Sequence, residues 1–332
     1  MLEDSLESFD TPILLITYNK VDTTKLVLNK ILKQNPKHLI IASDGPKSQK
    51  SYDQVHSLRR YFDDNIDIPF TKMYSDTNKG CKEGVEHAIT ESFKIYDELI
   101  ILEDDTLPSK KFFKYAENLL KIYKYNKKVS LISGYNYLSK SSIRQPYFFS
   151  KYSNIWWWAT WKDRWTDRTE LNKANLDKFL AKNDSSRTFH KEEEVYYVDN
   201  FKEVIAGNLD SWAFGLTFSN FFNKKLSIIP KYNLIKNIGL GHKNATHTNN
   251  KISFDIITLN LILSIFQRTK YLYVEPRQNL KEDNKFHNKV IAKKTFYNKT
   301  VYKIYKIFKR LWILLLHIDF NLYSLGDCFI FL

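Results

Sequence analysis

The chain has 332 residues, 43% of them hydrophobic and 27% charged, so it can form one large or two modest globular domains. Its 51 Lys and Arg against 37 Asp and Glu give a formal net charge of +14, which favours nucleic acid, an acidic membrane surface or a phosphorylated substrate as partner. Cys81 and Cys328 are far apart, which excludes a disulfide framework and a thiolate zinc site and makes the cytoplasm the expected location. The acidic first ten residues lack the apolar core of a signal peptide.

Short apolar runs alternate with helical patterns near the start of the chain. The apolar runs predict buried strands at 12–18, 38–43, 69–74 and 99–102. Apolar residues at helical spacing, or helix-favouring composition, predict helices at 21–34, 51–62 and 81–96. Such an alternation predicts a doubly wound α/β sheet.

Three carboxylates follow the fourth predicted strand. Glu103, Asp104 and Asp105 come directly after the apolar run 99–102. Ligands of open α/β sheets collect outside the carboxyl ends of the strands, so these side chains are expected at a binding edge. Carboxylate oxygens suit hard divalent ions, Mn²⁺ or Mg²⁺, which also bind the phosphates of a substrate. The sequence therefore predicts a metal site for a phosphorylated ligand, with a solvated acidic turn as the alternative.

The ends of the first two strands are expected at the same edge. Residues 17–19 form the end of the first strand, and a nucleotide would lie beside them. Asp44, after the second strand, could accept hydrogen bonds from a base or ribose, or could instead serve as a helix cap or turn aspartate. Lys79, near the start of the third helix, could meet phosphate together with the helix backbone, or could be an ordinary surface lysine.

Aromatic residues gather in the middle of the chain. A helix is predicted at 109–125 and a strand at 129–133, and residues 147–165 then include five of the seven tryptophans. Sugars stack their apolar faces on aromatic rings, so this region predicts either a carbohydrate site or aromatic core packing. Residues 172–200 are polar and predict a mobile loop with short helices. A helix ending at 222, a strand at 227–230 and a loop at 238–248 with two histidines follow.

Six segments stand in a recognisable order, at 13–20, 43–46, 78–81, 101–108, 158–161 and 245–248. Together they resemble the successive blocks of bacterial GT-A-fold glycosyltransferases, often described as nucleotide-diphospho-sugar transferases. This family is similar to the eukaryotic N-acetylglucosaminyltransferase that opens complex N-glycan synthesis. The resemblance covers roughly residues 11 to 250. It implies a mixed sheet with a Rossmann-like nucleotide-sugar-binding half at 1–108, an acceptor-binding and catalytic half at 109–250, and a basic helical extension at 251–332.

The resemblance also implies a nucleotide-sugar donor, with a UDP-sugar expected, and Mn²⁺ or Mg²⁺ at the acidic motif. Asp105 would be the direct metal ligand, Asp104 would contact the ribose or donor sugar, and Glu103 would support both. His247 would reach the metal or diphosphate, although His242 is a second candidate. The nucleotide-sugar pocket would be completed by Thr17, Tyr18, Asn19, Asp44 and Lys79.

The catalytic base of the eukaryotic relative is an aspartate just before a tryptophan. In this chain Ser211 precedes Trp212, so Asp210 is the nearest carboxylate and is expected to be the base. Trp158, Trp161 and Trp212 would contact the donor sugar or a glycan or glycolipid acceptor. One carboxylate base without a covalent nucleophile predicts inversion of the anomeric configuration.

Other classes of function remain as alternatives. A catalytically silent carbohydrate-binding or nucleotide-binding protein of the same fold would keep the site without turnover, and a nucleotidyltransferase would share the metal carboxylates. Nucleic-acid binding is not expected, because no recognised motif appears and the excess positive charge is concentrated near the C-terminus.

That basic region has nine Lys or Arg and no Asp or Glu between positions 285 and 310. If residues 299–315 are helical, apolar side chains fall on one face and lysines on the other, as in a helix that lies on an anionic membrane surface. The alternative is a helix packed on the protein with its lysines in water. The apolar run 311–316 is too short to span a bilayer, so peripheral attachment at the cytoplasmic face of the inner membrane is expected.

Overall fold

The computed structural model describes residues 9–136, 145–181 and 191–239, without side chains at 191–193. The first half of the chain contains β1 (Ile13–Thr17), α1 (Val21–Leu32), β2 (Leu39–Ser43), α2 (Gln49–Asn65), β3 (Phe70–Tyr74), α3 (Gly80–Ile95), β4 (Glu98–Glu103), β5 (Thr106–Pro108) and α4 (Lys110–Tyr123). The second half contains β6 (Val129–Ser133), β7 (Tyr147–Ser150), β8 (Trp158–Trp161), α5 (Lys162–Thr166), α6 (Lys173–Ala181), α7 (Lys191–Ile205), α8 (Trp212–Phe222), β9 (Leu226–Pro230) and β10 (Ile235–Asn237).

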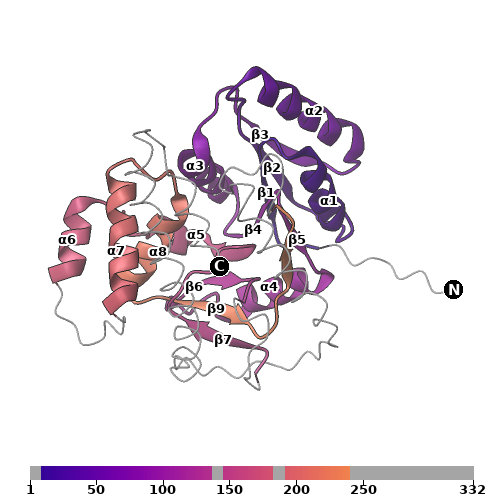
Figure 1. The fold of residues 1–332 in the computed structure, drawn as a ribbon. Coiled ribbons are helices and arrows are strands. Elements are labelled where there is room, and N and C mark those ends of the chain that lie inside the picture. Colours follow the sequence, from indigo (N-terminus) through magenta and orange to yellow (C-terminus); the bar gives the residue numbers. More distant parts are fainter. Residues whose placement is uncertain (1–8, 137–144, 182–190, 240–332) are drawn as a thin grey trace.

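One mixed sheet organises this part of the chain (Figure 1). Its eight strands lie in the order β3-β2-β1-β4-β8-β6-β9-β7. The first four are parallel neighbours, whereas β8 runs antiparallel between β4 and β6, and β7 runs antiparallel to β9. The α/β class and the mixed sheet are therefore confirmed. Strands from before and after residue 108, the predicted boundary between the two halves, belong to this one sheet. The strands β5 and β10 form a separate antiparallel pair.

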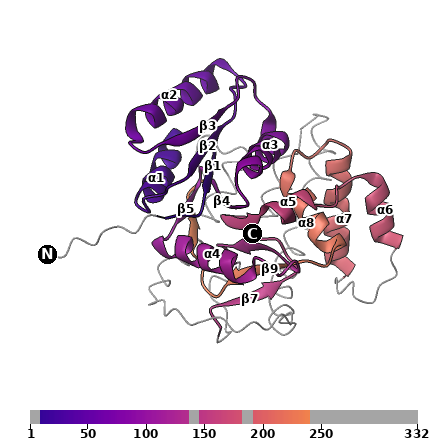
Figure 2. The ribbon, with the colours of Figure 1, turned by 180° about the vertical axis from the view of Figure 1, so that it is seen from behind.

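Helices cover both faces of the sheet because its central strands are apolar throughout. In β1, Ile13 and Leu15 pack into one core cluster and Leu14 into another, as expected when successive side chains point to opposite faces. The first cluster receives side chains from α1, α2 and α4, and the second receives them from α3, α5 and α8. The two views agree that α1 and α3 lie on opposite sides of β1 and β2 (Figures 1 and 2).

A third core cluster contains side chains of α6, α7 and α8, and these three helices lie together on one side of the structure (Figure 2). Phe179, Phe201 and Phe218 meet there in edge-to-face contacts. The sequence predicted a mobile loop with short helices over 172–200, and the structure has helices there, α6 with 9 residues and α7 with 15. Their apolar residues are sparse among charged ones, and only the tertiary arrangement brings them together.

The predicted sugar-contacting tryptophans lie in the core. Trp158 is 1% exposed, Trp161 2% and Trp212 4%. Trp158 stacks on Trp212 with ring centroids 5.6 Å apart, and the Trp161 indole N–H donates to the Leu120 carbonyl at 3.2 Å. This burial favours core packing, the alternative that the sequence left open, over contact with a sugar.

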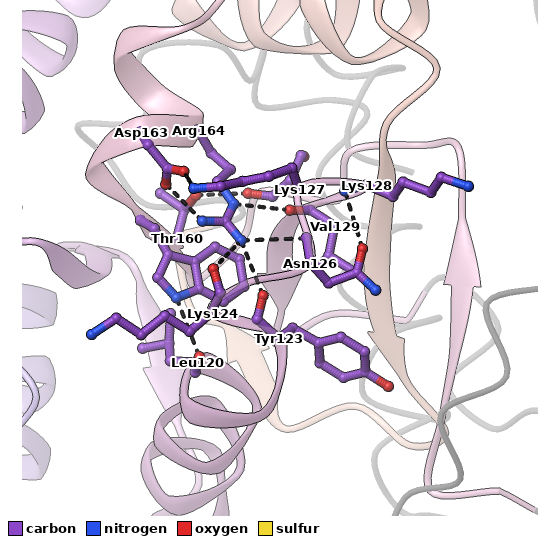
Figure 3. Close-up of polar contacts among 12 residues, drawn as sticks. Leu120, Tyr123, Lys124, Asn126, Lys127, Lys128, Val129, Thr160, Asp163 and Arg164 are labelled. Atoms are coloured by element: carbon purple, nitrogen blue, oxygen red, sulfur yellow. Dashed lines mark hydrogen bonds and ion pairs between the residues drawn. The ribbon is translucent and has the colours of Figure 1, made fainter.

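A buried arginine connects the end of α4 to the sheet (Figure 3). The Arg164 guanidinium donates to the carbonyl oxygens of Tyr123, Lys124, Asn126 and Val129 at 2.6 to 3.3 Å. The same side chain lies over the Trp161 ring.

None of the helices described here is both long and apolar enough to cross a membrane.

Candidate functional site

The carboxyl ends of β1, β2 and β4 meet at one edge, because these three strands are parallel neighbours. The backbone N–H of Tyr18, just after β1, donates to Asp104 Oδ2 at 3.0 Å, just after β4. Asp104 is only 6% exposed. The end of the first strand and the acidic motif thus lie together, at the edge of the sheet where open α/β proteins bind ligands.

A lysine lies between the two aspartates. Lys20 Nζ is 2.6 Å from Asp105 Oδ2 and 3.4 Å from Asp104 Oδ1. All three side chains are largely buried, with 14% of Lys20, 8% of Asp104 and 19% of Asp105 exposed. Lys20 was not among the site residues predicted from the sequence. The parallel pairing of β1 and β4 explains the contact. A residue shortly after β1 lies beside a residue shortly after β4 whenever these two strands pair in parallel, so Lys20 could be found only once the strand order was known.

Burial and like charge shift the pKa values of this cluster. Burial, followed by the charge of Asp105, raises the pKa of Glu103 to about 8, so this carboxyl keeps its proton at neutral pH. Burial also raises the pKa of Asp104, although the Lys20 charge opposes the shift. For Lys20 burial opposes the charged form, but the charges of Asp104 and Asp105 outweigh it and raise the pKa of the ammonium.

The chain after β10 passes directly over Asp105. The backbone N–H groups of Ile238 and Gly239 donate to the Asp105 carbonyl oxygen at 2.8 and 3.0 Å. A Cβ on Gly239 would lie 2.5 Å from Asp105 Cβ, so only glycine fits without a shift. The segment that leads toward His242 and His247 therefore starts at the acidic motif. Both histidines lie outside the described residues.

Asp44 holds the turn before α3. Its carboxylate accepts hydrogen bonds from the backbone N–H groups of Lys79 and Gly80 at 2.9 and 3.2 Å and from Asn78 Nδ2 at 3.0 Å. These contacts favour the turn aspartate over a contact with a base or ribose. The Lys79 ammonium lies 3.8 Å from Glu83 Oε1, one turn along the helix.

The three residues at the end of β1 have different surroundings. Thr17 is buried and its hydroxyl donates to the Ala42 carbonyl at 3.0 Å, which fastens β1 to β2. Tyr18 and Asn19 are half-buried. The Tyr18 hydroxyl accepts from the Lys47 N–H at 3.3 Å, and Asn19 Nδ2 donates to Gln54 Oε1 at 3.3 Å. Tyr18 and Asn19 are thus the two that lie at the edge.

Arg59, which the sequence analysis did not identify, joins the ends of β2 and β3. Its guanidinium donates to the Ser43 hydroxyl and carbonyl at 3.0 and 2.9 Å and to the Ser75 carbonyl at 2.7 Å. Burial lowers the pKa of Arg59. The side chain fixes the strand ends next to the site, and its signal in the sequence is an arginine among the apolar positions of α2.

Asp210, the expected base, caps helix α3. Its two carboxylate oxygens accept hydrogen bonds from the backbone N–H groups of Cys81 and Lys82, both at 2.9 Å. Gly80, with φ +79°, allows this approach, because a Cβ there would lie 2.8 Å from Asp210 Oδ2. A carboxylate at the N-terminus of a helix satisfies donors that have no partner within the helix.

Replacing Asp210 separates capping from catalysis. We expect Asp210→Ala to lower the free energy of unfolding by about 1 kcal/mol in urea titrations, because the α3 donors lose their acceptor. Asp210→Asn keeps one acceptor oxygen and should lose less stability. If Asp210 is only a cap, Asp210→Asn keeps its kcat. If Asp210 is the catalytic base, the kcat of Asp210→Asn falls by about 10²-fold or more. A stable Asp210→Ala protein would contradict the capping role.

The acidic motif fits a divalent ion of the Mg²⁺ or Mn²⁺ type. Asp104 and Asp105 already converge on one cation, the Lys20 ammonium, and supply oxygen donors of the kind that such ions prefer. Across residues 9–136, 145–181 and 191–239, no three His, Cys, Asp or Glu side chains gather as a complete metal site. Two carboxylates with the phosphates of a substrate are nevertheless a common ligand set for Mg²⁺.

No sequence-family model matches the chain, and no curated protein sequence matches it. Among solved structures it is similar to the mannosyltransferase PcManGT from Pyrobaculum calidifontis in complex with GDP-Man and Mn²⁺. The identity is 16% and the TM-score 0.28, over 38% of this chain and 34% of that one. Neither the family models nor the curated sequences link the chain to the N-acetylglucosaminyltransferase that it resembles in its motifs.

Two further solved structures match a larger share of this chain. UDP-glucose pyrophosphorylase complexed with UDP-glucose matches 67% of this chain and 91% of its own, with 8% identity and a TM-score of 0.33. The WbbM bifunctional glycosyltransferase matches 77% of this chain and 44% of its own, with 12% identity and a TM-score of 0.31. These similarities are distant, since all three TM-scores lie below 0.5. At these scores the similarity assigns neither a reaction nor a substrate.

Proposed function

We propose that the chain is a metal-dependent glycosyltransferase that moves a sugar from a nucleotide-diphosphate donor, a UDP-sugar, to a glycan acceptor. The observation that carries the proposal is the convergence of Asp104 and Asp105 on one cation at the carboxyl edge of a parallel sheet. A nucleoside diphosphate and a divalent ion are the ligands that such an edge is built to take.

The residues of the edge then have separate tasks. Asp105, with Asp104 beside it, would hold Mn²⁺ or Mg²⁺, which neutralises the charge that develops on the diphosphate leaving group. Tyr18 and Asn19 would line the nucleotide pocket, and Glu103, which keeps its proton, would support the two aspartates. Asp44 and Lys79 would contribute to the nucleotide pocket by holding the turn before α3 in place. We propose His247 as an additional contact to the diphosphate, because it follows eight positions after Gly239, whose N–H binds the Asp105 carbonyl.

The transfer itself requires a base for the acceptor hydroxyl and a surface for the acceptor. Asp210 is our candidate base, and a single-displacement reaction with that base inverts the anomeric configuration. The second half of the sheet would carry the acceptor, a glycan or a glycolipid of surface polysaccharide or lipid-linked glycan synthesis. The basic region at 285–310 would hold the protein on an anionic membrane surface.

One observation favours a second candidate, a nucleotide-binding or carbohydrate-binding protein without turnover. Both oxygens of Asp210 are engaged by backbone donors of α3, so the candidate base has a structural task already. A silent protein would bind the nucleotide sugar at the same edge and release it unchanged.

A thermal-shift screen of nucleotide sugars, with and without Mn²⁺, tests the proposal. At a concentration about 100 times its dissociation constant, the true donor should stabilise the protein by about 2.7 kcal/mol and raise the melting temperature by about 5 °C. The shift should depend on Mn²⁺. Release of UDP from the donor in the presence of a glycan acceptor then separates the transferase from the silent protein. If no nucleotide sugar shifts the melting temperature, the proposed function is wrong.

A further inference from the structure

The Lys20 ammonium stands where a divalent ion would bind. Its Nζ contacts Asp105 Oδ2 at 2.6 Å and Asp104 Oδ1 at 3.4 Å, and these are the oxygens that the proposed function gives to the metal. A divalent ion and an ammonium cannot share that position. The metal must therefore displace Lys20 before both aspartates can bind it.

We propose that Lys20 couples metal binding to nucleotide binding, so that the site takes up a divalent ion together with a nucleoside diphosphate and binds either one alone only weakly. This inference rests on the proposed function for its ligands. It assigns a role to one residue that the acidic motif alone does not contain.

Charge balance gives the reason. With Lys20 in place, two carboxylates and one ammonium carry one net negative charge in a largely buried cluster. A divalent ion alone would bring the cluster to a net positive charge, with the displaced ammonium beside it, which is costly at low effective dielectric constant. A diphosphate supplies new negative charge and new acceptors for the ammonium, so metal and diphosphate together restore the balance.

The lysine side chain suits such a change of partner. Its ammonium is a compact charge on a flexible stem of four carbons, so it can turn from a carboxylate to a neighbouring phosphate. Its backbone is fixed, because the Lys20 carbonyl accepts hydrogen bonds from the Thr24 N–H at 3.0 Å and from the Thr24 hydroxyl at 2.7 Å. The start of α1 thus anchors a side chain that only has to rotate.

The test measures Mn²⁺ binding by electron paramagnetic resonance on the full chain, with and without UDP, in the wild type and in Lys20→Met. Without UDP we expect Lys20→Met to bind Mn²⁺ about tenfold more tightly or better than the wild type. The factor by which UDP strengthens Mn²⁺ binding should fall by at least the same amount in the variant, because it has no ammonium that the metal must displace and the phosphate must accept. Mn²⁺ should strengthen UDP binding by the same factor as UDP strengthens Mn²⁺ binding, because coupling is reciprocal. Equal Mn²⁺ affinity of the two proteins without UDP would overturn the inference.

Two further variants control the comparison. Lys72→Met removes the same charge from an exposed pair with Asp63, and it should leave Mn²⁺ binding unchanged. A tighter binding in Lys72→Met equal to that of Lys20→Met would reduce the effect to overall charge and overturn the inference. If Lys20→Met does not fold, Lys20→Gln, which keeps a donor without the charge, takes its place with the same expectation. If UDP has no effect on any variant, the proposed function fails, while the comparison without UDP still decides the role of Lys20.

Discussion

Asp105→Asn should lower kcat/KM for sugar transfer by about 10³-fold, a loss of about 4 kcal/mol of transition-state stabilisation. The carboxylate of Asp105 is the most exposed of the pair that converges on Lys20, and it is our candidate for the direct metal ligand. An amide in its place keeps the size of the side chain but loses the charge that holds a divalent ion. The measurement is initial-rate kinetics with the donor found by thermal shift, over a series of Mn²⁺ concentrations.

The variant should remain folded, so its defect can be assigned to chemistry. Lys20 keeps Asp104 as its partner, and the Asp105 carbonyl still accepts from Ile238 and Gly239. Asp63→Asn removes an exposed carboxylate paired with Lys72 and should leave kcat/KM within about twofold. Retention of most of the kcat/KM by Asp105→Asn would contradict its assignment as the metal ligand.

The sequence predicted the parallel half of the sheet because its strands are short and apolar throughout. Residues 13–17, 39–43 and 98–103 form β1, β2 and β4, close to the runs that were predicted. The strands β7 and β8 were not predicted, since their aromatic residues indicated a binding region and core packing equally well. The strands β5 and β10 have three residues each, which is too short for a pattern.

The site was predicted in part, for a related reason. The position of Asp104 and Asp105 after a buried strand placed them at the carboxyl edge from the sequence alone. Their contact with Lys20 joins residues 84 and 85 positions apart, and the cap formed by Asp210 on α3 spans 128 and 129 positions. Such contacts depend on strand order and on how a loop returns to a helix, which local sequence patterns do not contain.

The tryptophans illustrate the limit most clearly. A tryptophan that stacks on a sugar and one that fills a core have the same composition signal, and only burial distinguishes them. Here Trp158 packs into the core cluster that contains α3, α5 and α8, and Trp161 packs into the cluster that contains α1, α2 and α4, so helices cover both rings. Their burial moves any acceptor contact to residues that flank the strands.

Arg164→Met should lower the free energy of unfolding by about 3 to 5 kcal/mol, more than any other substitution proposed above. The guanidinium is 3% exposed and donates to four backbone carbonyls and to Asp163 Oδ1 at 2.7 Å, while it covers the Trp161 ring (Figure 3). Methionine fills part of the volume but leaves these buried acceptors without donors. Urea unfolding followed by circular dichroism measures the loss.

Two matched variants show whether the network or the charge matters. Arg164→Lys keeps the positive charge, but a single ammonium cannot reach carbonyls on several sides, so we expect it to lose at least half as much stability as Arg164→Met. Lys127→Met removes the exposed cation that also pairs with Asp163, and it should cost at most about 0.5 kcal/mol. Because β6 and β8 pair next to this network, we expect its loss to destabilise the strands of the second half of the sheet more than β1 to β4. A cost below about 1 kcal/mol for Arg164→Met would mean that water replaces the guanidinium and that the end of α4 is held by apolar packing alone.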